Sequence, residues 1–305
     1  MPKNGIVAID SEIVVVLIYH LNPFTLYIDI IVNGKVKDRI DLHSIEDYKQ
    51  DHKAIIFGYK NGFGLIHYDN NQHQYEYIYL WETIDNLYKK VKIINPFPTD
   101  EFGWIAHPIQ GSYMENNSIV FSLKAYRHFM AQYWSILQIA DNFSSATWVT
   151  KLNELDLNLF PETYTKKNTG SDWLSIIAIS YINDKIHIQS NGGDRSRSKT
   201  GPAFEFNIIS VYDMKGNPIR SVQIENGTGN YSSSKEYLIV RKEEDKNKLI
   251  FYKTMDYSYE ELSLTSKQNL GNIKLSVHDQ IKTDSFLSKV WIYSRRFLHE
   301  CEMVF

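Results

Sequence analysis

The sequence has a single cysteine, Cys301, among its 305 residues. One thiol excludes an internal disulfide and a zinc site built from several thiolates, and its place between Leu298 and Val304 predicts a small buried thiol in a strand. Long apolar runs are also missing, because the longest, Ile13 to Tyr19, is far below the roughly 20 residues of a membrane-spanning helix. We therefore read that run as a buried strand and expect no membrane association.

Basic and acidic residues are also nearly balanced, so neither sign of charge is in excess. The chain has 33 basic and 36 acidic residues and a net charge of −3, so it lacks the basic excess of a dedicated nucleic-acid binder. Its first residues, Met1 to Val7, lack the apolar core and cleavage site of a secretory signal. Together with the lone cysteine, these features predict a cytoplasmic protein that does not bind nucleic acid.

Motifs for catalysis and cofactor binding are missing too. The ten histidines do not show the paired spacing of a zinc-binding helix, and neither a Gly-x-Ser-x-Gly nucleophile elbow nor a phosphate-binding loop occurs. His187 alternates with Ile186 and Ile188, which predicts a structural or surface histidine on the opposite face of a strand. We expect no catalytic residue, no metal and no cofactor, and a protein that is not an enzyme.

What the sequence does contain is a series of β-hairpins and 21 tyrosines, a residue that suits both strands and recognition surfaces. The clearest hairpin runs from Phe24 to Leu42, where Asn33-Gly34 favours the positive φ angles of a type I′ turn. Two further hairpins are predicted at residues 206–225 and 237–254, each around a short polar turn.

The strands group into sets of three or four. After a first set before residue 43, the sets begin near Lys53, Glu101, Asp172, Ser232 and Gly271, and their irregular spacing averages about 50 residues. This arrangement resembles the β-propeller architecture, without the repeat motif of any particular family. We therefore predict an all-β protein, a single domain over residues 1–305 with about six four-stranded blades. Only three strands are visible in the last set, so the spare N-terminal strand, Gly5 to Ile9, is expected to close that blade.

Several segments allow more than one interpretation. Residues 83–91 and 126–137 place apolar side chains at helical spacing and could form helices. The Gly-x-Gly segments at residues 62–64 and 227–229 predict turns between strands. Residues 153–171 carry little strand pattern and predict a long loop between blades.

The most conspicuous polar segment, residues 191–202, lies between two predicted strands and is longer than an ordinary hairpin loop. Binding often resides in long loops on rigid scaffolds, although a solvated loop without a ligand is the plain alternative. Basic side chains of this loop can pair with carboxylates or phosphates, and tryptophans at the beginnings of two strand sets could add contact area. The predicted partner-binding residues are Arg195, Arg197, Lys199, Trp104 and Trp173.

The leading functional hypothesis is a non-enzymatic protein-binding module that neutralises or scaffolds a partner protein with an acidic surface. An alternative is a carbohydrate-active hydrolase, because glycosidases use paired carboxylates and acidic residues stand near strand beginnings at Asp100, Glu101, Asp172 and Glu205. A second alternative is a propeller that binds a sugar or another small ligand in its central funnel.

Overall fold

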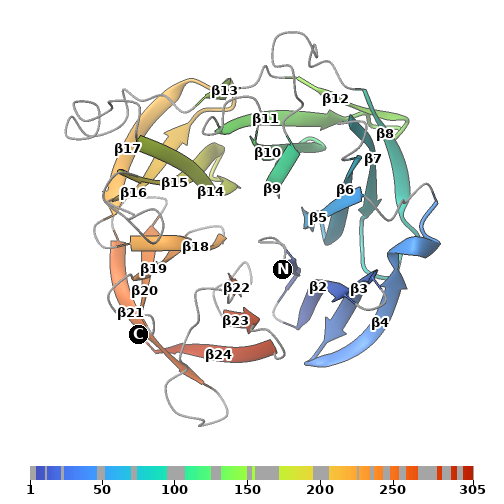
Figure 1. Cartoon of the computed structure of the whole chain (residues 1–305), viewed down its shortest axis with the longest axis horizontal. Helices are drawn as coiled ribbons and strands as arrows, with labels where there is room; N and C mark the ends of the chain where they lie inside the picture. Colours follow the sequence, from blue (N-terminus) through green and yellow to red (C-terminus); the bar gives the residue numbers. More distant parts are fainter. Residues whose placement is uncertain are drawn as a thin grey trace. The chain divides into compact units, whose positions relative to one another are not determined.

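The structure is a computed structural model of the whole chain. It describes residues 5–10, 12–21, 24–46, 52–69, 74–94, 107–124, 132–149, 153–154, 172–194, 206–224, 227–233, 237–242, 248–253, 259–266, 280–283, 290–293 and 298–304. In these ranges the regular structure consists of β-strands and one 3-10 turn, η1 (Leu42–Ser44) (Figure 1).

The strands form sheets in which chain neighbours pair antiparallel. The first sheet contains β1 (Ile6–Ala8), β2 (Ile13–Leu21), β3 (Phe24–Val32) and β4 (Lys35–Asp41). The second joins two meanders and a short extra strand: β5 (His52–Tyr59), β6 (Gly62–Asp69), β7 (Gln74–Trp81), β8 (Lys89–Ile94), β9 (His107–Tyr113), β10 (Ser118–Lys124), β11 (Gln132–Ile139), β12 (Ser145–Trp148) and β13 (Asn153–Glu154). The outer strands β8 and β12 of its two meanders pair in parallel.

Two further sheets follow along the chain. The third contains β14 (Asp172–Ile182), β15 (Lys185–Asp194), β16 (Phe206–Tyr212) and β17 (Pro218–Ile224). The fourth contains β18 (Gly227–Ser233), β19 (Tyr237–Lys242), β20 (Lys248–Lys253), β21 (Tyr259–Ser266), β22 (Gln280–Thr283), β23 (Val290–Tyr293) and β24 (Leu298–Val304).

The four-stranded antiparallel meander is the blade unit of a propeller. The prediction of an all-β, propeller-type chain is therefore confirmed, whereas the number of six blades stays a prediction. The chain divides into two compact units, Met1–Arg127 with Trp134–Leu152 and His128–Tyr133 with Asn153–Phe305. The prediction of a single domain is not tested by this division.

The predicted hairpins are confirmed. Asn33 has φ 50° and Gly34 φ 75°, the two positive angles of a type I′ turn, and β3 pairs with β4 directly across it. Strands β16 and β17 form the second predicted hairpin, and β19 and β20 form the third. The tip of the third, residues 243–247, lies outside the described residues.

The expectation that the N-terminal strand closes the last blade is wrong. Strand β1 pairs with β2 in the first sheet, Ile6 opposite Val16 and Ala8 opposite Val14. The turn between them is tight because the Asp10 carboxylate accepts hydrogen bonds from the backbone N–H groups of Glu12 (2.7 Å) and Ile13 (2.8 Å). A short turn closes at low entropic cost, so the nearest strand in sequence becomes the partner.

The helical interpretations and the glycine turns need correction as well. Residues 89–94 form β8, and Leu87, placed with buried residues by helical spacing, is 92% exposed. Strand β11 covers residues 132–139, while residues 125–131 lie outside the described part. Both Gly-x-Gly segments begin strands, β6 and β18, and Gly64 lies so close to the ring of Phe57 that a side chain would collide with it.

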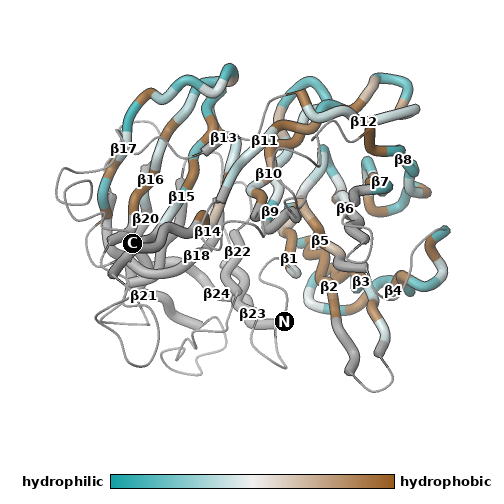
Figure 2. Tube along the Cα trace, turned by 45° about the horizontal axis from the view of Figure 1, so that its top comes forward, coloured by the Kyte–Doolittle hydropathy of each residue, from teal (hydrophilic) through white to brown (hydrophobic). Residues whose placement is uncertain are grey.

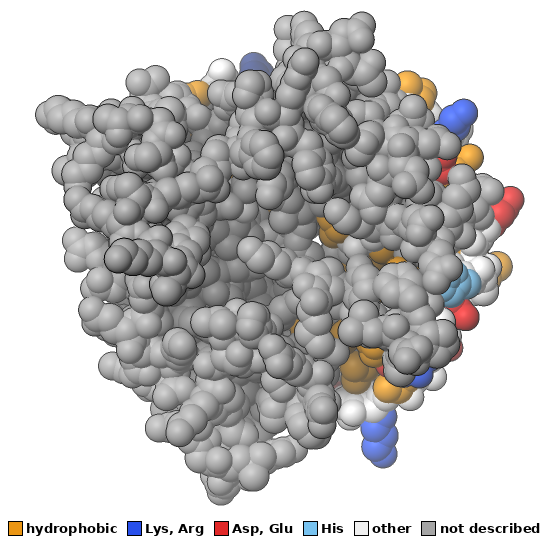
Figure 3. Space-filling view, in the orientation of Figure 1, with side chains coloured by type: hydrophobic (Ala, Val, Ile, Leu, Met, Phe, Trp, Pro, Cys, Tyr) orange, Lys and Arg blue, Asp and Glu red, His pale blue; other side chains and the backbone are white. Residues whose placement is uncertain are grey.

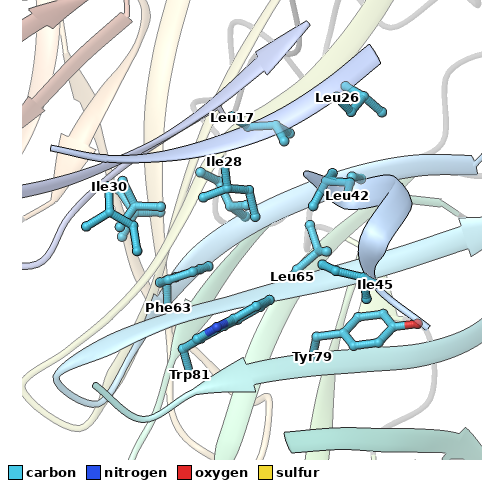
Figure 4. Packing of buried hydrophobic residues seen from close by; sticks show 14 residues of the cluster. Leu17, Leu26, Ile28, Ile30, Leu42, Ile45, Phe63, Leu65, Tyr79 and Trp81 are labelled. Carbon is cyan, nitrogen blue, oxygen red and sulfur yellow. The ribbon is translucent and has the colours of Figure 1, made fainter. Parts of the chain in front are cut away.

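The best-described core lies between the first sheet and β5–β7. Leu17, Ile28 and Ile30 of the first sheet pack against Phe63, Leu65 and other side chains of the second (Figure 4). Phe63 and Trp81 stack with ring centroids 4.4 Å apart. Figure 2 shows hydrophobic colour on parts of β2 and β5 and mostly hydrophilic colour along β4, whose side chains are mostly exposed.

Candidate functional site

Two residues in the described ranges adopt a backbone conformation that their side chains disfavour. Seven non-glycine residues have positive φ, and five of them are Asn or Asp, which tolerate this region well. The other two are Lys60, at φ 50° in the β5–β6 turn, and Phe143, at φ 58° in the β11–β12 turn. Strained residues of this kind concentrate at functional sites.

The two strained residues meet in one cluster. The Lys60 ammonium lies 5.4 Å from the Phe143 ring centroid, and the Lys89 ammonium lies 3.8 Å from it, within cation–π range. Both lysines donate hydrogen bonds to Glu82, Lys60 Nζ to Oε1 at 2.6 Å and Lys89 Nζ to Oε2. We call Lys60, Glu82, Lys89 and Phe143 the turn cluster.

The turn cluster is only partly covered from solvent. The exposed fractions of the side chains are 32% for Lys60, 27% for Glu82 and 43% for Lys89, and Phe143 is half-buried. Hydrogen bonds from Lys60 and then Lys89 lower the pKa of Glu82. Partial burial lowers the pKa of Lys60, but hydrogen bonds and charge attraction with Glu82 and Tyr59 outweigh it, so the net shift is upward.

These shifts limit the chemistry of the turn cluster. A general acid or base is most effective when its pKa lies near the working pH. Glu82 and Lys60 are both shifted away from neutrality, so each stays charged and neither is suited to proton transfer at pH 7. The arrangement is suited to recognition, since it combines an aromatic ring with fixed charges.

Neighbouring turns extend the same surface. Leu87, 92% exposed, lies on the chain segment between Glu82 and Lys89. The buried Tyr59 hydroxyl donates to Asn117 Oδ1 at 3.3 Å, and Asn117 Nδ2 donates to Asp141 at 3.3 Å, which ties the β9–β10 turn to its neighbours. Lysine, arginine and acidic side chains are interspersed along the described surface in Figure 3, so neither sign of charge dominates.

The structure places one of the five predicted binding residues. Trp173 lies in β14, with its backbone opposite Gly193 of β15. Strand β15 extends to Asp194, so residues 191–194 of the predicted loop belong to a strand, and residues 195–202 lie outside the described residues. Trp173 is at the same end of the sheet as Asp194. Trp104, Arg195, Arg197 and Lys199 lie outside the described residues.

Among the acids considered for hydrolysis, Asp172 lies in β14 opposite Asp194 of β15. Asp100, Glu101 and Glu205 lie outside the described part. Within the described ranges no group of three or more His, Cys, Asp or Glu residues could hold a metal ion. Helices long and apolar enough to cross a membrane are likewise not found among the described residues.

The sequence analysis missed the turn cluster. The segment Asp141–Ser144 separates two predicted strands, which does signal a turn, but sequence does not say which turn residue takes the positive φ. Contacts between Lys60 and Phe143, 83 positions apart, depend on how two meanders pack. A phenylalanine in a turn otherwise made of Asp, Asn and Ser was the one available signal.

Comparison with known proteins gives structural likenesses only. No family model matches the chain, and no curated protein matches it. Similar solved structures include a mutant α-L-arabinanase of Cellvibrio cellulosa, 10% identical over 87% of this chain and 92% of that chain, with a TM-score of 0.39. A glycosyl hydrolase of Bacteroides ovatus is 12% identical over 82% and 79%, with a TM-score of 0.41. A mitotic checkpoint complex chain is 7% identical over 100% and 93%, with a TM-score of 0.37.

Proposed function

We propose that the protein is a non-enzymatic protein-binding module and that the turn cluster is part of its binding surface. The observation that carries this proposal is Phe143, an aromatic residue held at φ 58° with a half-buried ring in contact with two lysines. A bulky residue in this conformation costs about 1–2 kcal/mol. Glycine or asparagine would fit the turn without that cost, so the ring itself is the feature that needs an explanation.

The surroundings of Phe143 support recognition of a protein. Aromatic residues are enriched where partner proteins bind, and a rigid, half-covered ring loses little entropy on binding. Exposed Leu87 adds apolar area, while the lysines can meet carboxylates of the partner. These properties fit the acidic protein surface expected from the sequence.

Phe143→Gly separates a binding role from a structural one. Glycine relieves the strained φ, which offsets the loss of two exposed cation–π contacts worth about 0.5–1 kcal/mol each. We therefore expect an unchanged melting temperature and at least a tenfold loss of affinity for the partner. The partner is captured from the host with the wild-type protein, purified, and titrated against both proteins by calorimetry.

Asn183→Gly is the matched control, because Asn183 has φ 50° in the β14–β15 turn and lies outside the turn cluster. This variant should keep both stability and affinity. If Phe143→Gly melts several degrees lower while its affinity is unchanged, the turn cluster only holds the turns together, and its role in binding is refuted.

The predicted loop from Arg195 to Lys199 is proposed as a separate partner-binding site. Replacing Arg195 and Arg197 by alanine should change the free energy of unfolding by less than about 0.5 kcal/mol, as is usual for loop substitutions, but weaken partner binding. Replacement of both arginines by lysine keeps the charge but removes the planar guanidinium groups, so binding through bidentate contacts should still weaken. Equal affinity of the double-alanine variant and the wild type would refute a binding role for these residues.

Carbohydrate hydrolysis is the second candidate function, and one observation favours it. Asp172 and Asp194 are direct cross-strand partners, and retaining glycosidases use two carboxyl groups about 5 Å apart. Release of reducing sugar from a panel of plant and bacterial polysaccharides, lost in both Asp172→Asn and Asp194→Asn, would support it. A wild-type protein inactive on the whole panel would leave the binding function as the proposal.

A further inference from the structure

His187 lies at the centre of the third sheet, buried between that sheet and β20. It is 1% exposed, in a row between Ser180 of β14 and Val211 of β16. Its ring makes an edge contact with the ring of Tyr252, with centroids 6.3 Å apart. Neither Nδ1 nor Nε2 has a hydrogen-bond partner among the described residues.

We propose that His187 is an acid-sensitive switch: its protonation opens the packing of β14–β17 against β20 while the first sheet stays closed. A buried imidazole without partners is stable only in its neutral form, because a charge in this position is neither hydrated nor paired. His187 must therefore remain neutral for this packing to hold, and acid acts on it directly.

The charged groups around His187 increase this sensitivity. On its own strand, Lys185 lies two residues away on the same face, and on β17 Arg220 continues the row beyond Val211. On β20, the titratable side chain of Tyr252 contacts the imidazole ring. The positive charge of Lys185 disfavours the imidazolium.

The direction of the pH effect follows from these contacts. Burial, with a smaller contribution from Lys185, lowers the pKa of His187 from 6.5 to about 4. The opened state, where the ring is hydrated, binds its proton near pH 6.5 and the closed state only near pH 4. Closure is therefore fully favourable above pH 6.5 and weakens as the pH falls toward 4, and at pH 5 the opening equilibrium should rise about 30-fold.

Hydrogen exchange tests the switch on the full chain. Amide protection is measured at pH 7 and pH 5, corrected for intrinsic exchange rates, in peptides from β14–β16 and from β2–β3. We expect protection of β14–β16 to fall about 20-fold between pH 7 and pH 5, with a much smaller change in β2–β3. In His187→Leu the fall should disappear, whereas His43→Gln, which alters an exposed histidine, should behave as wild type.

Equal loss of protection in both sheets, or an unchanged loss in His187→Leu, would overturn the proposal. Because leucine could impair folding, a titration of the wild-type histidines by NMR provides an independent measurement. At least one of the ten histidine ring signals should show no change between pH 8 and pH 5.5. If all ten titrate with midpoints near pH 6.5, His187 is accessible to protons in the closed state and the switch does not exist.

Discussion

Arg39→Ala is expected to lower the free energy of unfolding by about 2 kcal/mol. Asp29 is 3% exposed and has its carboxylate in a bidentate ion pair with Arg39, whose Nε lies 2.6 Å from Oδ1 and whose Nη2 lies 2.8 Å from Oδ2. Removing one partner of a buried pair costs about 3–5 kcal/mol. Because the Arg39 side chain is 54% exposed, water will partly replace it and reduce that cost.

Two further variants test this prediction, and their free energies of unfolding are measured in urea. Lys37→Ala on the same strand removes an exposed pair, in which Lys37 is 48% and Asp85 73% exposed, so about 0–1 kcal/mol is expected. The double variant Asp29→Val, Arg39→Val leaves no unpaired charge and should be more stable than Arg39→Ala alone. A double variant as unstable as the single one would show that the pair is not what stabilises this sheet.

Gly64→Ala is expected to destabilise the first unit by about 2–3 kcal/mol, the upper range for overpacking a core. A methyl group at Gly64 would lie 2.2 Å from Cζ and 2.4 Å from Cε2 of Phe57. The ring of Phe57 cannot move away freely, because it is 2% exposed and meets the ring of Phe121 edge-on at 5.4 Å. The neighbouring meander repeats this contact, with Gly111 against Phe121.

Gly58→Ala is the matched control, because its methyl group would make an ordinary contact, 3.6 Å from Val7 Cγ1. Its melting temperature should lie close to that of the wild type, while Gly64→Ala should melt clearly lower. Adding Phe57→Leu to Gly64→Ala should recover part of the loss, so the double variant costs less than the sum of the single changes. Strict additivity would contradict a direct clash between these two residues.

Features determined by neighbouring residues were predictable from the sequence. Asn33-Gly34 selects its turn type through the φ preferences of those two residues, and alternating side chains between short turns identify the strands. The all-β class follows from many such local signals that agree.

Tertiary structure decided what depends on residues far apart in the chain. The pattern of β1 predicts a strand but not the sheet whose edge it joins. Helical spacing at residues 83–91 suggested a helix, but residues 89–91 belong to β8, which pairs with β7. Alternation along the strand predicts that His187 points to the opposite face of the sheet from Ile186 and Ile188. All three are buried, because an inner strand between packed sheets is covered on both faces. The positive φ angles of Lys60 and Phe143 were not predictable either, since the sequence does not say which residue of a hairpin turn takes the left-handed conformation.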